Sequence, residues 1–181
     1  MIGIFFAEGY EEIEALTVVD ILRRGKVDIQ MISITEDKVV RGSHGIPVEM
    51  DHTLSEVDLG EMDMMILPGG MPGTRNLEAC DTLMQALDAQ YKADKYIAAI
   101  CAAPTVFGHR GYLQNRKACC YPGMEGDLTG AEVSFDKAVK DGHVITGRGM
   151  GCAIAFALLI LETLQGKEAA ERMAESIVYE A

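Results

Sequence analysis

The chain has 181 residues, of which 49% are hydrophobic and 24% charged, and its formal net charge at pH 7 is -12. This composition is typical of a folded globular protein and excludes a disordered chain, and the length fits one domain over residues 1–181. So acidic a surface repels phosphate groups, so we expect neither nucleic acid nor an anionic membrane as a partner.

The sequence also indicates where the protein resides. The N-terminal stretch MIGIFFAEGYEE has no basic segment and acids directly behind a short apolar run, unlike a signal peptide. The apolar run at 152–164 is too short to cross a bilayer. Five cysteines without an export signal favour reduced thiols, so we expect a cytoplasmic protein.

Strands and helices are predicted to alternate along the first half of the chain. Residues 2–6 read as a buried strand, and 10–25 carry a helical apolar stripe that stops at Gly25. Residues 27–34 form a second strand, and 38–50 read as a hairpin around two glycines. A central strand at 63–70 ends in the turn Pro-Gly-Gly.

The second half continues the alternation. It comprises an amphipathic helix at 75–93, a strand at 96–100, short strands at 117–121, 131–135 and 143–147, a largely buried helix at 152–166 and a short helix in the tail at 167–181. Strands separated by helices predict βαβ units, and hence an α/β fold with a mainly parallel sheet and helices on both faces. Ligands of such sheets bind at the carboxyl ends of the strands.

Cys101 occupies one of these strand ends. It follows the strand YIAAI and begins a predicted helix, with small residues on both sides. This arrangement is typical of a nucleophile elbow, and a helix N-terminus favours a thiolate over a thiol. The alternative is a buried thiol that only packs.

The other cysteines have weaker claims. Cys119 and Cys120 are adjacent in a predicted strand and therefore point to opposite faces, whereas Cys80 and Cys152 lie in helical patterns and resemble core residues. The sequence has no Cys-x-x-Cys pair, so we expect no metal site.

A nucleophile needs an anion hole and a proton carrier. Gly69 and Gly70 leave a strand end with exposed N–H groups, which makes them candidate donors, although an ordinary glycine turn is the alternative. His109 is too far along the predicted helix to reach Cys101, since eight residues span about 12 Å. The sequence shows no evident Cys–His pair.

An acidic cluster supplies the remaining candidate. Glu11 and Glu12 are explained by a helix N-terminus, which stabilises carboxylates. Glu14 lies between Ile13 and Ala15, so it is expected to face inward towards the strand ends, where burial would raise its pKa and let it donate a hydrogen bond to a thiolate.

Four segments together resemble the ThiJ/PfpI superfamily, in particular its DJ-one branch. They are AEGYEEIEALTVVDILRRG, ILPGGMPGTRNL, YIAAICAAPTVFG and ITGRGMGCAIAFALLILETLQGKEAA, which follow one another in family order over nearly the whole chain. The resemblance implies a flavodoxin-like three-layer sandwich and a homodimer. It also implies that Cys101 is the reactive thiol, that Glu14 is its buried hydrogen-bond partner, and that Gly70 and Ala102 supply the N–H groups.

Two positions bear on the activity that the resemblance implies. The protease branch has a histidine directly after its cysteine, where this chain has Ala102, so a protease is disfavoured. Several members carry a histidine near the cysteine at the place of Tyr121, and a phenol is a poor general base at neutral pH.

The expected function is therefore a cofactor-independent, cysteine-dependent enzyme that acts on small reactive carbonyls, like the glyoxalases or deglycases of the family. The alternatives are a redox-sensing or stress-protective, chaperone-like protein that uses oxidation of Cys101, and a partner-binding protein. The motif GRGMG lacks the spacing of a dinucleotide-binding loop, so no nicotinamide or flavin cofactor is expected.

Overall fold

A single seven-stranded sheet forms the centre of the computed structural model, which describes residues 1–180. The strand order is β10-β11-β7-β6-β1-β2-β5. The strands are β1 (Ile2–Phe6), β2 (Ile29–Ser33), β5 (His52–Thr53), β6 (Met64–Leu67), β7 (Tyr96–Ile100), β10 (Ala138–Asp141) and β11 (Val144–Gly147). All neighbours pair in parallel except β10, which runs antiparallel to β11. The mainly parallel sheet predicted from the sequence is confirmed.

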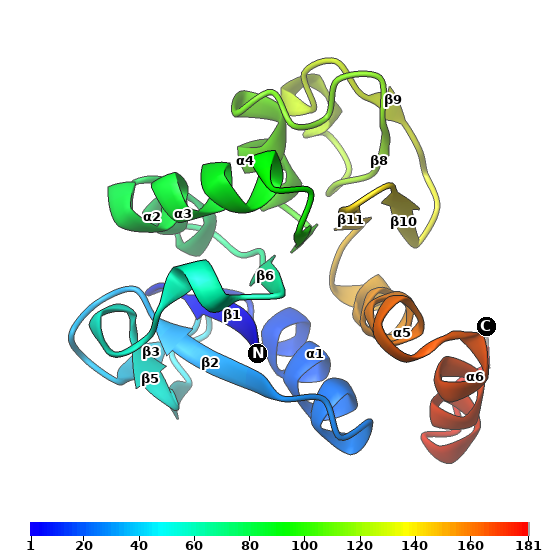
Figure 1. The fold of residues 1–181 in the computed structure, drawn as a ribbon, viewed down its shortest axis with the longest axis horizontal. Coiled ribbons are helices and arrows are strands. Elements are labelled where there is room, and N and C mark those ends of the chain that lie inside the picture. Colours follow the sequence, from blue (N-terminus) through cyan, green and yellow to red (C-terminus); the bar gives the residue numbers. More distant parts are fainter. Residues whose placement is uncertain (181) are drawn as a thin grey trace.

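Helices cover both faces of this sheet (Figure 1). One face carries α1 (Glu12–Arg24) and α5 (Ala153–Gln165), and α6 (Lys167–Ser176) packs on the outside of α5. The other face carries α2 (Gly73–Glu78), α3 (Asp81–Lys92) and α4 (Pro104–His109). The result is the predicted three-layer sandwich.

Alternating side chains of the strands feed two separate cores. In β1, Ile4 and Phe6 pack in the core beneath α1 and α5, whereas Phe5 packs in the core beneath α3 and α4. Because successive residues of a strand point to opposite faces, a strand that is apolar throughout must be covered on both sides. This is why the uninterrupted apolar strands of the sequence require two helix layers.

Helix α1 begins and ends where the sequence indicates. The Glu11 carboxylate caps its N-terminus by accepting the Glu14 backbone N–H at 2.7 Å, and Gly25 ends it. The buried stripe that includes Val18 and Leu22 faces the sheet. The cap matters for the site, because it fixes which residue of the first turn faces inward.

The helix and strand boundaries differ from the sequence prediction in several places. The predicted helix at 75–93 is interrupted, because the Cys80 backbone is extended and caps α3. The strands predicted at 117–121 and 131–135 shrink to β8 (Lys117–Ala118) and β9 (Glu132–Val133), while the hairpin is confirmed as β3 (Val39–Arg41) and β4 (Pro47–Glu49). The short edge strands β5 and β10 were not predicted, since so few residues carry no clear periodicity.

Short 3-10 turns complete the chain, and most of them lie in loops. They are η1 (Leu54–Glu56), η2 (Leu59–Glu61), η3 (Glu125–Asp127) and η4 (Met150–Cys152).

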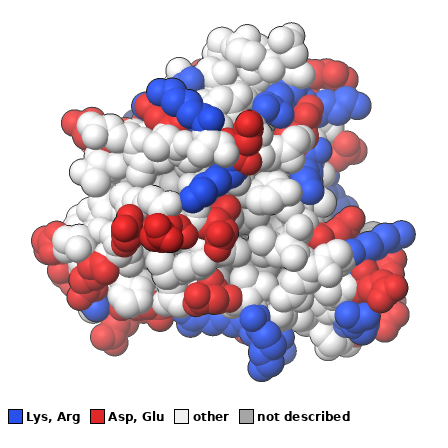
Figure 2. All heavy atoms as spheres, viewed as in Figure 1, with Lys and Arg blue, Asp and Glu red and all other residues white. Residues whose placement is uncertain are grey.

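Charged side chains of both signs are spread over the face shown in Figure 2, with basic ones singly or in small groups between acidic ones. Among the described residues, no helix combines the length and the apolar character needed to cross a membrane.

Candidate active site

The strand ends converge where the sequence predicts a site. The turn after β6 carries Gly69 and Gly70, and the turn after β7 carries Cys101. The N-terminus of α1 brings Glu14 to the same place, since the Gly69 N–H donates to its Oε2 at 3.1 Å. A thiol, a carboxyl group and a glycine turn therefore meet at the carboxyl edge of the sheet.

Cys101 has the strained backbone of a nucleophile elbow. Its φ is +65°, a left-handed value that non-glycine residues rarely adopt. Two hydrogen bonds hold it: its N–H donates to the Gly147 carbonyl at 2.9 Å, and its carbonyl accepts the Tyr121 N–H at 2.8 Å. Such a conformation costs about 1–3 kcal/mol and persists only where the surroundings enforce it. Helix α4 begins at Pro104, so two residues separate it from Cys101.

Both glycines of the central turn are sterically required. A Cβ on Gly69 would lie 2.5 Å from Glu14 Oε2 and 2.6 Å from Cys101 Cβ. Gly70 has a φ of +94°, and a Cβ there would lie 2.4 Å from the Glu11 backbone nitrogen. A side chain at position 69 would therefore push the Glu14 carboxyl group and Cys101 apart. The sequence analysis did not assign this role to Gly69.

Glu14 faces inward, as predicted, and is fully buried. Burial raises its pKa from 4.5 to about 7, and the negative charge of Glu11 acts in the same direction. The neighbouring Cys101 side chain and the Gly69 N–H, which donates to Oε2, lower the pKa but do not outweigh burial. Oε1 has no hydrogen-bond partner among the described residues. A large fraction of Glu14 is therefore protonated near neutral pH.

The prediction that this site lowers the thiol pKa of Cys101 is wrong, because the pKa is raised. Burial raises the pKa of the thiol, and so do the charge and the hydrogen bond of the Glu14 carboxylate. Only the N–H groups of Ala102 and Gly70 lower it. The two side chains compete for one proton: when Glu14 holds it, the opposing charge disappears and the carboxyl group can donate a hydrogen bond to a thiolate.

A pocket of about 380 Å³ lies over the Cys101 sulfur. It is lined by Gly70, Met71, Cys101, Ala102, Tyr121, Pro122, Gly123 and Met124. Gly70 and Ala102 line this pocket together with Cys101, and their backbone N–H groups act to lower the pKa of the thiol, so both residues lie beside the sulfur as the sequence analysis expected. The pocket walls Met71 and Met124 were not predicted, because loop residues carry no periodic signal.

Tyr121 lies beside Cys101, as expected, and its side chain is half exposed. No histidine lines the pocket in the part of the chain that the structure describes. His109, for example, hydrogen-bonds to Glu78 Oε1 at 2.7 Å instead. The described residues around the sulfur therefore offer one proton carrier with a pKa near neutrality, Glu14.

The remaining cysteines differ in part from the prediction. Cys119 and Cys120 lie beyond the end of β8, so the predicted strand on which the argument for opposite faces rested does not include them, and both are buried. Cys80 and Cys152 are only half-buried, since each lies at a helix cap rather than in a helix interior. Burial raises the thiol pKa of Cys119 to about 11 and that of Cys120 to about 12, and neither residue lines the pocket beside Cys101.

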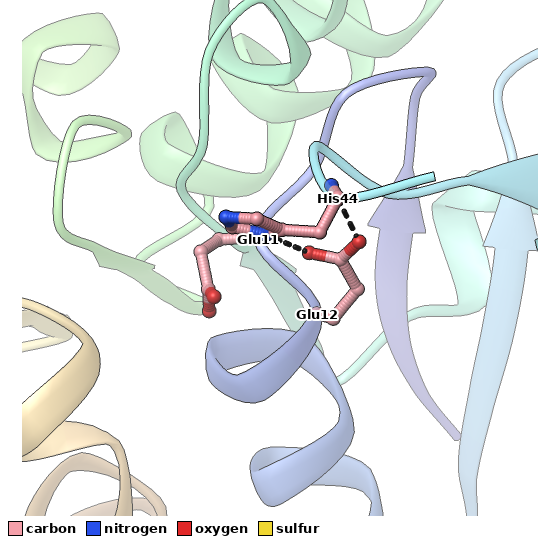
Figure 3. A group of neighbouring side chains, drawn as sticks. All are labelled: Glu11, Glu12 and His44. Carbon is pink, nitrogen blue, oxygen red and sulfur yellow. Dashed lines mark hydrogen bonds and ion pairs between the residues drawn. The ribbon is translucent and has the colours of Figure 1, made fainter. Parts of the chain in front are cut away.

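A second polar group lies at the N-terminus of α1 (Figure 3). Glu12 is almost fully buried, and its oxygens accept the His44 backbone N–H at 2.8 Å and contact His44 Nδ1 at 3.0 Å. Although burial opposes ionisation, hydrogen bonds from His44 and Ser43 lower the pKa of Glu12 to about 2. The ion pair raises the pKa of His44.

Glu11, Glu12 and His44 place their potential ligand atoms within 4.8 Å of one another. The Glu12 oxygens are engaged with His44 and Ser43, and Glu11 caps α1. These contacts tie the turn between β3 and β4 to the helix that carries Glu14. We therefore assign the group a structural role.

A parallel α/β sandwich with a cysteine on a strained turn beside a buried glutamate defines a class of nucleophile-elbow proteins. Comparison with known families gives the assignment: the model of the DJ-1/PfpI family matches residues 1–163. The chain belongs to this family.

Individual relatives agree with the assignment. Protein dj-1beta of Drosophila melanogaster is 33% identical over 177 residues, covering 97% of this chain and 95% of its own. Protein DJ-1 homolog B of Arabidopsis thaliana is 35% identical over 174 residues, 95% of this chain. This chain spans less than half the length of the two Arabidopsis relatives, at 40% and 44%. Glutathione-independent glyoxalase DJR-1.2 of Caenorhabditis elegans is 35% identical, covering 89% of this chain and 86% of its own.

Solved structures show the same fold. Drosophila melanogaster DJ-1beta superposes with a TM-score of 0.93 at 32% identity, covering 99% of this chain and 98% of its own. An oxidized Toxoplasma gondii DJ-1 superposes with a TM-score of 0.95 at 32% identity and the same coverage. The flavodoxin-like three-layer architecture is thus established for this chain.

We expect Gly69→Ala to disrupt the site. The added methyl group has no room between the Glu14 carboxyl and the Cys101 Cβ, so it should cost about 1–3 kcal/mol of unfolding free energy and change the rate at which iodoacetamide modifies Cys101. Urea denaturation and peptide mass spectrometry measure the two effects. Gly151→Ala is the matched control, because nothing lies within 4 Å of its Cβ. Equal behaviour of the two variants would contradict the geometry.

Glu14 should make stability depend on pH. Its pKa is raised on folding from 4.5 to about 7, so the folded state holds the proton more tightly and the corresponding stability is lost as pH rises through this interval. At about 1.4 kcal/mol per pKa unit, the loss amounts to about 3 kcal/mol. The Glu14→Gln variant has no carboxyl group at this position, so its free energy of unfolding should not show this loss. In urea denaturation from pH 4.5 to 8, its stability relative to the wild type should therefore increase as the pH rises. Parallel pH profiles would contradict the raised pKa.

Proposed function

We propose that the protein is a cofactor-independent enzyme that converts small reactive carbonyl compounds through Cys101. The observation that carries the proposal is that Cys101, Gly70 and Ala102 line one pocket while the buried Glu14 carboxyl group lies beside the thiol. A relative with 35% identity, the nematode DJR-1.2, is named a glutathione-independent glyoxalase. The family and this name support a carbonyl substrate.

The first step uses the proton that the pair shares. With the proton on Glu14, the Cys101 thiolate adds to the aldehyde carbon and forms a carbon–sulfur bond. The carbonyl electron pair moves to the oxygen, which accepts hydrogen bonds from the Gly70 and Ala102 N–H groups. Glu14 then donates its proton to this oxygen, which gives a neutral hemithioacetal.

The later steps require a base, and Glu14 is by then ionised. For a 2-oxoaldehyde, the carboxylate removes the hydrogen of the former aldehyde carbon as a proton and returns it to the neighbouring carbon. The hydroxyl proton of the hemithioacetal passes to the former ketone oxygen, and a thioester is left on Cys101. Water then cleaves the thioester and releases a 2-hydroxy acid with the thiol. Methylglyoxal would give lactate. A pKa of about 7 suits a group that must both donate and accept a proton near neutral pH.

Cys101→Ser should abolish methylglyoxal consumption. A serine hydroxyl stays protonated in this site, so turnover should fall by at least about 1000-fold. The turnover of Glu14→Gln should fall similarly, because this variant lacks the proton carrier. Lactate formation measured enzymatically is the readout. Cys152→Ser should keep wild-type turnover, because Cys152 does not line the pocket. Unchanged turnover in Cys101→Ser would rule out the mechanism.

A redox sensor is the second candidate, because Glu14 is placed to hydrogen-bond oxygens added to the Cys101 sulfur. The comparison with an oxidized DJ-1 from Toxoplasma gondii favours it. Peroxide would convert the thiolate to a sulfenic and then a sulfinic acid. Peptide mass spectrometry after mild peroxide should find Cys101 modified before Cys80 and Cys152, which are also half-buried. Earlier oxidation of either would exclude the sensor.

The homodimer implied by the family resemblance stays a prediction. We propose that a second copy docks in the groove of about 680 Å³ along α1. Ile13 and Ile46, both about half exposed, give the groove an apolar rim, and Leu16 and Ile154 line it. Exposed apolar residues gathered in one groove are typical of a protein interface.

A further inference from the structure

The pocket over Cys101 has uncharged walls. Its side chains are two methionines, Met71 and Met124, the ring of Tyr121 and Pro122, and the other lining residues besides Cys101 are glycine and alanine. None of these lining residues is a lysine, an arginine or a histidine. The pocket therefore offers a substrate apolar contact and backbone N–H groups, but no cation.

Acidic groups lie next to this lining. The Glu125 carboxylate accepts the N–H of Gly123, a lining residue, at 2.7 Å. At the base, the Glu14 carboxyl contacts the sulfur, and the charge of Glu11 is strong enough there to help raise the Glu14 pKa. No cation is among the groups that lower the Cys101 pKa.

Arg148 is the cation that acts on the neighbouring cysteines, but it is engaged elsewhere. It lowers the pKa of Cys119 and Cys120, yet its guanidinium stacks over the Phe135 ring at 5.5 Å and donates to the Phe135 carbonyl at 3.3 Å. It does not line the pocket. An anion that entered the pocket would lose hydration without finding an opposite charge, and would face acids.

We propose that this pocket selects uncharged electrophiles: it admits neutral aldehydes and 2-oxoaldehydes with small apolar substituents and rejects analogues that carry a carboxylate or a phosphate. The inference rests on the proposed function in naming carbonyls as substrates. The charge selection itself depends only on the pocket walls and the surrounding acids.

Alkylation of Cys101 tests the selection without requiring turnover. Iodoacetamide and iodoacetate react alike, since in each the thiolate displaces iodide, and they differ mainly in charge. We expect the ratio of their rate constants at Cys101, read by peptide mass spectrometry, to exceed the same ratio for 2-mercaptoethanol by at least about tenfold. Added salt should reduce this excess by screening. A ratio equal to that of the free thiol would overturn the proposal.

A pair of variants isolates the charge of the wall. Met71→Lys and Met71→Gln both replace a half-exposed thioether with a polar chain, and only the first brings a cation. The iodoacetamide-to-iodoacetate ratio should be several-fold lower in Met71→Lys than in Met71→Gln, mainly through faster reaction with iodoacetate. Equal ratios in the two variants would show that size rather than charge decides.

Measuring turnover distinguishes the charge selection from the proposed enzymatic function on which it rests. 4,5-Dioxopentanoate and its methyl ester share the 2-oxoaldehyde that the mechanism requires, and only the first carries a carboxylate. We expect kcat/KM for the carboxylate to be at least about tenfold lower than for the ester, with a smaller gap in Met71→Lys. Equal use of both substrates overturns the selection while the enzymatic function stands. If neither substrate is turned over while the iodoacetamide-to-iodoacetate ratio at Cys101 is still high, the proposed enzymatic function is rejected and the charge selection of the pocket is supported.

Discussion

The contact between the Glu14 carboxyl group and the Cys101 sulfur governs the chemistry of this protein. Both groups favour their neutral forms when buried side by side, so around neutral pH the pair carries either two protons or one. A thiolate exists in this setting only when the carboxyl group carries the proton. The nucleophile and the acid are therefore two states of one pair, and neither side chain has the same role without the other.

The fold supports this contact through backbone rather than side chains. Gly69 leaves just enough room for the two groups and donates its N–H to Glu14. The left-handed turn at Cys101 is held from two directions, by the carbonyl of Gly147, the last residue of β11, and by the N–H of Tyr121, which lies further along the chain. Strain of this kind is stored where a function needs a side chain aimed away from its strand.

The site and the groove along α1 divide the first helix between two surfaces. Glu14 faces the sheet and the thiol, whereas Ile13 and Leu16 face the groove. The ion pair of Glu12 with His44 fixes the β3–β4 turn against the same helix end. The orientation of α1 thus sets the position of the Glu14 carboxyl group and the shape of the outer groove together.

The sequence by itself determined the layered α/β fold, because apolar strands and amphipathic helices alternate with clear periods, and it placed Cys101, Glu14 and the glycine turn at strand ends. It could not determine the broken helix at Cys80, the two edge strands or the pocket walls, which depend on caps and loops without periodicity. Only the tertiary structure decided the protonation of the site. The pKa of Cys101 depends on burial and on a carboxyl group 87 positions away in the chain, and no local pattern encodes the distance between them.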